Sequence, residues 1–293
     1  MTPAASGFLA IVVLLSAPLV LAAAGELILE KSGSIQIGLE GTMLVGAFTT
    51  FAFGFRGASP TIALLMGGVA GALFGFLFAL FAVWRRADPI LVGTAWNLLA
   101  LGLTAFSYRI VAGVTGSVLQ VATLHAFAFG LPLAVLAVYL VPFALDAFLR
   151  FTRPGLILAA AGENPEAVHA LGISVVRIRS AASVFSGLAA GLAGGLLVVT
   201  VSPTFVEGLT AGRGFLALSL VVFCRWKPLG LIPAGLLLGC ATALQYRLQA
   251  GGSGDTPYAL FLALPGLLSL GALALFSSSS RGGAPRALGT PAP

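Results

Sequence analysis

The chain contains 293 residues, of which 59% are hydrophobic and only 8% are charged. This composition excludes an ordinary soluble domain and is typical of a protein whose helices lie in a membrane. The formal net charge is +6, but the basic residues are scattered at the ends of apolar runs. We therefore expect no basic surface for nucleic acid and no nucleic-acid partner.

Apolar runs without a charged residue follow one another along the chain. Seven of them reach or nearly reach the ~20 residues that span a bilayer, namely 1–25, 57–84, 89–108, 110–145, 180–206, 228–246 and 256–280. Two others, 41–55 and 214–224, have 15 and 11 residues and are predicted to be half-length or broken helices inside the bundle. The sequence predicts an all-α, polytopic membrane protein of about nine transmembrane segments. It forms a single domain over 1–276, followed by a disordered tail, 277–293, rich in Ser, Gly and Pro.

The distribution of basic residues predicts the orientation of the chain. With nine segments and the loop 150–179 in the cytoplasm, eleven basic residues lie inside and only Arg56, Arg109, Arg213 and Arg247 lie outside. This asymmetry follows the positive-inside rule. The first segment has no basic n-region and is expected to remain as an uncleaved helix. We expect a multi-pass protein of the plasma membrane with its N-terminus outside and its tail in the cytoplasm.

The order of the segments suggests an inverted repeat. A long segment, a short one and two long ones precede residue 108, and the same order recurs from residue 180, with 129–149 as an unpaired connector. An odd connector inverts the second copy. Inverted repeats with broken helices are typical of transporters, because half-helix ends offer polar backbone groups to a substrate near the membrane middle.

Glycines recur at helical spacing in two of the long segments. One carries Gly67, Gly71 and Gly75, and another carries Gly187 and Gly191. Small residues at such positions let helices approach closely, so these glycines predict tight helix packing.

The segment 161–173 is the one long polar stretch in this apolar chain. It is predicted to be a short docking helix, with Asn164 as N-cap, Pro165 at the first helical position and Glu166 where the helix dipole favours an anion. Gly172 ends the helix. Two turns are too short to be stable alone in water, so a partner subunit is expected to hold them. The residues expected to contact this partner are Glu163, Asn164, Pro165, Glu166, Ala167 and Gly172.

The source of energy for transport is expected to lie outside the chain. Neither of the two lysines, Lys31 and Lys227, follows a glycine, so the phosphate-binding loop of ATPases is absent. Ion-coupled carriers place ionisable groups deep in their helices. Here the nine acidic residues lie at or near predicted segment ends, and Asp146 is the deepest. An ion-coupled carrier or a membrane-embedded enzyme is therefore the less favoured alternative.

Four stretches in the same order resemble one family of membrane transporters, and they are 37–48, 97–103, 162–167 and 210–215. They are similar to the permease subunits of ABC importers of the branched-chain amino acid and ribose type, most closely to the nucleoside-uptake branch. The resemblance extends to 284–289. It implies a non-enzymatic permease subunit that imports nucleosides or related ribosides, with a sugar or branched-chain amino acid as the alternative substrate. It also implies cytosolic ATPase subunits, a second homologous permease subunit and an extracytoplasmic substrate-binding protein.

Five polar residues are candidates for further roles in such a permease. Gln36 and Glu40 begin the first short helix, where they form either a solvated helix end or a contact beneath the translocation pathway. Asn97 makes either a helix–helix hydrogen bond, worth ~0.6–2 kcal/mol, or lines the pathway. Glu207 and Arg213 flank the second short helix on the outside, where they either pair with each other or receive the binding protein. The chain shows no Cys/His cluster, so neither a metal nor a cofactor is expected.

Overall fold

The computed structural model describes residues 3–112, 119–128, 130–250, 266, 271 and 283–291. Within these residues, six helices are long and apolar enough to cross a membrane, and two shorter apolar helices accompany them. The expected segment 256–280 lies outside the described residues except for 266 and 271. The number of nine segments therefore stays a prediction.

The first part of the chain forms four helices and a short π-helical turn. They are α1 (Pro3–Lys31), α2 (Leu39–Phe55), α3 (Pro60–Ala79), η1 (Leu80–Trp84) and α4 (Pro89–Ala112). A two-stranded hairpin and four short helices follow, namely β1 (Ala126–Ala128), β2 (Leu131–Pro132), α5 (Leu133–Val138), α6 (Val141–Phe151), α7 (Arg153–Glu163) and α8 (Pro165–Ala170). The last elements described are α9 (Val175–Leu196), η2 (Leu197–Val201), α10 (Arg213–Phe223), η3 (Pro228–Gly230) and α11 (Leu231–Ala250).

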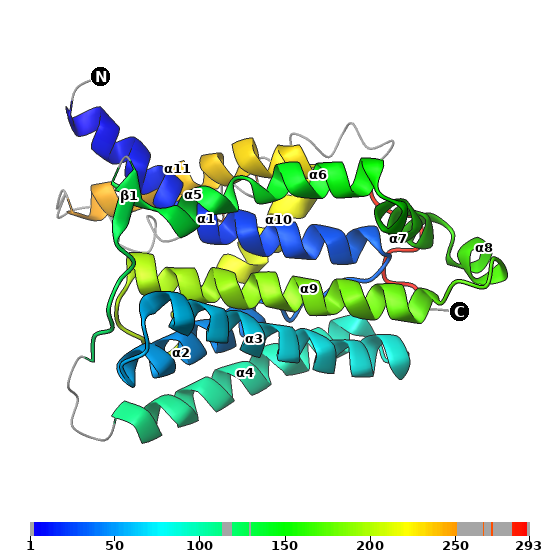
Figure 1. Ribbon diagram of the computed structural model, residues 1–293. Helices are drawn as coiled ribbons and strands as arrows, with labels where there is room; N and C mark the ends of the chain where they lie inside the picture. The colour runs from blue at the N-terminus through cyan, green and yellow to red at the C-terminus, as the bar shows by residue number, and fades with distance from the viewer. Residues whose placement is uncertain are drawn as a thin grey trace.

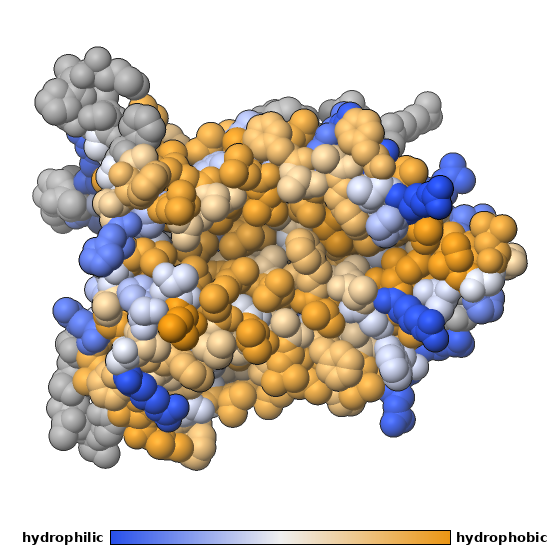
Figure 2. All heavy atoms as spheres, in the orientation of Figure 1, coloured by the Kyte–Doolittle hydropathy of each residue, from blue (hydrophilic) through white to orange (hydrophobic). Residues whose placement is uncertain are grey.

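The long helices lie side by side across the molecule (Figure 1). The N-terminus lies at one end of the bundle, while α7, α8 and the C-terminal segment lie at the other (Figure 1). On the face shown in Figure 2, apolar side chains form a broad band and polar residues gather toward the two ends. This is the distribution expected of helices that cross a membrane.

Among the described helices, α3 and α9 pack against each other most extensively. A Cβ built on Gly71 would lie 2.6 Å from the Cα of Gly191, and one built on Gly187 would lie 2.8 Å from the Cα of Gly75. Ser183 of α9 donates a hydrogen bond of 2.8 Å to the carbonyl oxygen of Gly75. The prediction that these glycines let helices approach closely is confirmed.

The two short helices expected from the sequence are present as α2 and α10. α2 packs against α3, α4 and α9, and α10 packs against α1, α2 and α11. Longer helices thus cover much of each short helix, as a helix too short to cross a bilayer requires.

The first helix extends beyond its expected end at residue 25. α1 continues to Lys31 and carries Glu26 and Glu30, whose side chains are fully or almost fully buried. The expectation that all acidic residues lie at segment ends, with Asp146 the deepest, is therefore wrong. The helix can hold these carboxylates because each accepts hydrogen bonds inside the bundle, Glu26 from Ser186 and Glu30 from the indole of Trp226.

The predicted segment 110–145 is not a single helix. α4 ends at Ala112, and the described residues from 119 to 125 are extended before the β1–β2 hairpin. Val121 and Leu124 donate backbone hydrogen bonds to Pro203 and Val199, so this strand is satisfied by the chain that follows α9. The membrane-length element here is 133–151, made of α5 and α6. The fold is mostly helical, and the hairpin is a small departure from the all-α prediction.

Part of the predicted disordered tail has defined contacts. Residues 283–291 lie against α7 and the end of α1 (Figure 1), where Ala287 and Gly289 donate backbone hydrogen bonds to Gly162 and Gly33. The expectation of disorder is wrong for this stretch, because its N–H groups pair with the body of the protein.

Candidate functional site

The N-terminal ends of the two short helices meet at Glu40. Glu40 lies in the first turn of α2, and its Oε1 accepts hydrogen bonds from Thr210 Oγ1 at 2.6 Å and from the backbone N–H of Gly212 at 2.8 Å. Its Oε2 accepts from the N–H of Gly214 at 2.5 Å. The unpaired N–H groups of a helix N-terminus favour an anion. The carboxylate of Glu40 therefore joins the N-terminal ends of α2 and α10. We call this contact of Glu40 with Thr210, Gly212 and Gly214 the α2–α10 junction.

Glycine is required on the α10 side of this junction. Gly212 has a φ of +83°, in the left-handed region that L side chains rarely adopt. A Cβ built on Gly214 would lie 2.5 Å from the Cα of Glu40. The absence of side chains at these two positions lets the α10 backbone approach the carboxylate directly.

Asn97 of α4 holds the start of α2 from the other side. Its Oδ1 accepts a hydrogen bond of 2.8 Å from the N–H of Gly41, and its Nδ2 donates one of 3.1 Å to the carbonyl of Ile37. The side chain is half-buried and bonded through both of its polar atoms. These two hydrogen bonds join α4 to the start of α2, and we call them the Asn97 clasp.

Gln36 fixes the link between α1 and α2. It is fully buried, its N–H donates to Glu26 Oε1 at 2.8 Å, and its Nε2 donates to Thr42 Oγ1 at 3.1 Å. Glu26 Oε2 in turn accepts from Ser186 of α9 at 2.9 Å. The Oε1 of Gln36 is buried without a hydrogen-bond partner among the described residues. An acceptor is thus available close to the first turn of α2.

A cavity of about 590 Å³ lies beside the N-terminal end of α10. Gly212 and Arg213 contribute to its wall, together with leucines of α1, η2, the loop before α10 and α10 itself. Its other polar lining residues are Ser202, Thr242, Gln245, Tyr246 and Gln249. An apolar wall with a few amide and hydroxyl groups is typical of a site for an uncharged polar ligand.

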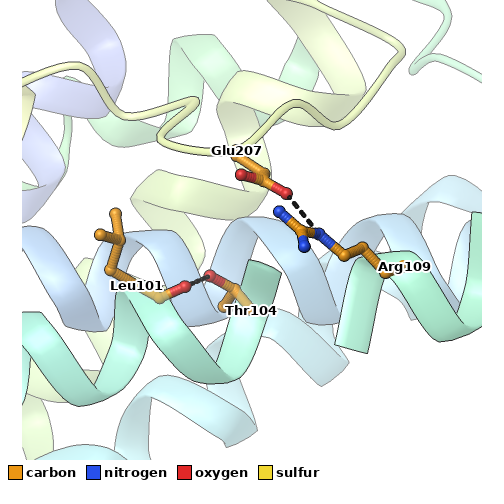
Figure 3. A network of polar contacts seen from close by, with 4 residues as sticks. All are labelled: Leu101, Thr104, Arg109 and Glu207. Carbon is orange, nitrogen blue, oxygen red and sulfur yellow. Dashed lines mark hydrogen bonds and ion pairs between the residues drawn. The ribbon is translucent and has the colours of Figure 1, made fainter. Parts of the chain in front are cut away.

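Glu207 and Arg213 do not pair with each other. Glu207 forms an exposed ion pair with Arg109 at the end of α4, with 3.2 Å between Nε and Oε1 (Figure 3). Arg213 donates to the hydroxyl of Tyr246 at 2.9 Å and to the carbonyl of Leu209 at 3.2 Å. Of the two alternatives, an ion pair between them is therefore wrong, because Glu207 bonds Arg109 of α4 while Arg213 bonds Tyr246 of α11, and docking of the binding protein stays a prediction.

The short polar helix forms as the sequence predicts. Asn164 Oδ1 accepts from the N–H of Ala167 at 3.0 Å, Pro165 and Glu166 lie in the first turn, and Gly172 has a φ of +78° after the last turn. Glu163, Glu166 and Ala167 are exposed. The chain itself stabilises part of this short helix, since Val168 is buried against Ala161 and Val175. α8 projects from one end of the bundle (Figure 1).

The sequence analysis missed Glu26, Ser186 and Thr210, which complete the contacts around α2. The spacing of Glu26 and Glu30, one helical turn apart and followed by Gly33, is the signal that could have extended α1 past residue 25. Ser186 carries no local signal, and Thr210 begins the stretch 210–215 that resembles the permease family, which does not identify its partner. Their importance depends on partners 160 and 170 residues away in the sequence.

Comparison with known proteins decides the family. Residues 8–273 match the family described as the branched-chain amino acid transport system permease component. The chain belongs to this permease family. Because the family consists of membrane permeases, this chain is a multi-pass transport subunit of the plasma membrane and is not itself an enzyme.

The relatives of this permease include proteins named for nucleoside transport. It is 34% identical to the guanosine ABC transporter permease protein NupQ of Bacillus subtilis, over 94% of this chain and 93% of that protein. It is 31% identical to the nucleoside ABC transporter permease protein NupC of Lactococcus lactis, over 89% of each chain. A permease of an ABC transporter works with ATPase subunits and, in importers, with a substrate-binding protein.

The fold also has a counterpart among solved structures. An inward-facing structure of a transporter described as a metal-chelate type ABC transporter superposes with a TM-score of 0.50. The two chains are 20% identical, and the match covers 92% of this permease and 86% of the other chain. At this identity the similarity supports the permease fold alone.

Proposed function

We propose that this permease forms the pathway of an ATP-driven importer of nucleosides or related ribosides. The similarity to NupQ over nearly the whole of both chains supports this substrate class most directly. The complete importer in this proposal contains a second, homologous permease subunit, two cytosolic ATPase subunits and an extracytoplasmic substrate-binding protein. A sugar is the alternative substrate, because ribosides and sugars present similar hydroxyl groups.

The substrate route in this proposal runs past the α2–α10 junction. The cavity beside Gly212 receives the substrate, and its amide and hydroxyl groups suit the edges of a base and the hydroxyls of a ribose. Glu40 closes the route while it bonds Thr210, Gly212 and Gly214. When α10 moves away from α2, its N–H groups and the unpaired acceptor of Gln36 become available to the passing substrate.

The two ends of the molecule have different partners in this proposal. The end with α8 faces the cytoplasm, and the exposed Glu163, Glu166 and Ala167 contact an ATPase subunit. The opposite end carries the exposed pair of Arg109 and Glu207 (Figure 3), which receives the binding protein. Arg213 is directed to Tyr246 beside the cavity, so we assign it to the route. Asn97 borders the route in this proposal, where it positions the start of α2 through Gly41 and Ile37.

Uptake by the reconstituted importer tests the substrate class. The permease is assembled in proteoliposomes with its ATPase subunits, its partner permease and its binding protein, and labelled guanosine, ribose, glucose and leucine are supplied separately. We expect ATP-dependent accumulation of guanosine that is competed by other nucleosides. Accumulation of glucose or leucine without guanosine would contradict the nucleoside assignment and leave the permease family unaffected.

A further inference from the structure

The C-terminal stretch 283–291 crosses the α8 end of the bundle and touches several elements. Ala287 is buried, and its N–H donates to the carbonyl of Gly162 at the end of α7 at 2.9 Å. Two residues later, the N–H of Gly289 donates to the carbonyl of Gly33 at 3.0 Å. A Cβ built on Gly162 would collide with the carbonyl oxygen of Lys31, so α7 also lies directly on the end of α1.

Arg179 of α9 fastens the same stretch from inside. Its side chain is 2% exposed, its Nε donates to the carbonyl of Ser32 at 3.1 Å, and its Nη1 donates to the carbonyl of Thr290 at 2.5 Å. Among the described residues, no carboxylate lies within ion-pair distance of this guanidinium. The Nη2 of Arg179 is buried without a hydrogen-bond partner among the described residues. A buried charge is costly unless hydrogen bonds satisfy it, so this guanidinium depends on the two carbonyls of Ser32 and Thr290.

The stretch also contacts the segment that precedes α2 and the segment that follows α10. Gly33, which it bonds, belongs to the link that runs through Gln36 into Glu40 and α2. At its other end, a Cβ built on Gly283 would lie 3.2 Å from the ring of Trp226, in the turn that follows α10. Trp226 is itself bonded to Glu30 of α1. The stretch thus contacts α7, the segment before α2 and the segment after α10.

We infer that residues 283–291 act as a strap that carries movement of the α7–α8 segment to α2 and α10, with Arg179 as the residue that positions the strap. The inference rests on the proposed function, in which an ATPase moves α8. A displacement of α7 pulls on the strap through Gly162, and the strap pulls on Gly33 through Gly289 and on Arg179 through Thr290. The junction then opens in step with ATP hydrolysis.

Two alanines within the strap allow a matched test. Ala287 is 6% exposed, whereas Ala284 is exposed, so the same substitution with leucine displaces the strap at one position and is tolerated at the other. Guanosine uptake and ATP hydrolysis are measured in the same proteoliposomes of the complete importer. For Ala287→Leu we expect uptake to fall about tenfold while hydrolysis stays within about twofold, since a loss of coupling separates the two rates. Ala284→Leu should match the unaltered protein.

A second variant covers the case in which Ala287→Leu fails to assemble. Arg179→Lys keeps the charge but replaces the planar guanidinium, whose Nε and Nη1 bond Ser32 and Thr290, with a single nitrogen, so the same separation of uptake from hydrolysis is expected. Equal falls in uptake and hydrolysis, unchanged uptake in either variant, or failure of both variants to assemble would overturn the inference. Guanosine uptake by Ala284→Leu shows separately that the proposed function holds.

Discussion

Asn97 bonds the backbone on both sides of the point where α2 begins. Replacement by leucine removes both hydrogen bonds and leaves the N–H of the buried Gly41 without its acceptor, at a cost of about 1–3 kcal/mol. We expect Asn97→Leu to lower guanosine uptake more than it lowers the amount of assembled importer, because α2 loses its position at the junction. Uptake per assembled complex, measured after size-exclusion chromatography, checks this expectation.

Thr104 provides the control on the same helix. It is 2% exposed, and its hydroxyl bonds only carbonyls within α4, including that of Leu101 at 3.2 Å (Figure 3). Thr104→Val should therefore leave uptake nearly unchanged. Equal losses in the two variants would show that α2 does not depend on the Asn97 clasp.

Reversal of the charge at Glu166 tests the proposed contact with the ATPase. The residue is exposed in the first turn of α8, where reversing its charge costs the helix at most about 1 kcal/mol. We expect Glu166→Lys to insert into the membrane normally and to lose most ATP-driven uptake, while Glu166→Gln keeps more of it. Normal uptake by Glu166→Lys, together with normal binding of the ATPase, would remove α8 from the coupling site.

At the scale of elements, the packing of α3 on α9 depends on glycine at particular positions. A methyl group at Gly71 would meet backbone atoms of Gly187 and Gly191, which cannot yield as a side chain can. We expect Gly71→Ala to destabilise the protein by about 1–3 kcal/mol, as overpacking of a core does. Thermal unfolding in detergent measures the change.

Gly102 of α4 is the matched control, because a Cβ added there meets no atom within 4 Å. Alanine has the higher helix propensity, by about 1 kcal/mol, so Gly102→Ala should be neutral or stabilising. The two substitutions are thus expected to have opposite signs. A Gly71→Ala protein as stable as the unaltered one would contradict the packing described for α3 and α9.

Local signals predicted some elements well and others poorly. The caps of α8 and the short lengths of α2 and α10 could be predicted from the sequence, because each depends on residues within a few positions of one another. The end of α1 was missed because the first carboxylate, Glu26, ended the apolar run, although its partners lie inside the bundle. The run 110–145 was misread because apolarity alone does not distinguish a helix from an extended segment that pairs with the chain after α9.

Only some of the residues around the start of α2, and few of their contacts, could be predicted from the sequence. Gln36, Glu40 and Asn97 do gather at the start of α2. The bonds from Glu40 to Gly212 and Gly214 join residues more than 170 positions apart, and no local pattern specifies such a pair. For the same reason, the ion pair of Glu207 with Arg109 was unforeseen.

At the scale of the whole molecule, the orientation in the membrane is open to direct measurement. His169 on α8 is exposed, and Val206 in the α9–α10 loop is 53% exposed. Cys224 and Cys240 are first replaced, and a single cysteine is then placed at 169 or at 206. In intact cells, an impermeant thiol reagent should label position 206 and spare position 169. Reversed labelling would place α8 outside and exclude its contact with a cytosolic ATPase.

The central claim is that the α2–α10 junction closes the substrate route. Glutamine at position 40 keeps one acceptor oxygen where the carboxylate has two, so at least one donor of α10 loses its partner. A hydrogen bond to a charged group contributes about 1.5–3 kcal/mol, which favours the open junction by about tenfold or more when it is lost.

Guanosine flux through Glu40→Gln, with and without ATP, tests this claim most directly. Proteoliposomes of the complete importer are loaded with labelled guanosine to measure efflux without ATP, and are supplied with it outside to measure ATP-driven uptake. We predict that efflux without ATP is negligible for the unaltered importer and clearly raised for Glu40→Gln, while net accumulation falls about tenfold. Efflux and accumulation that both equal those of the unaltered importer would show that the junction is not the closure of the route.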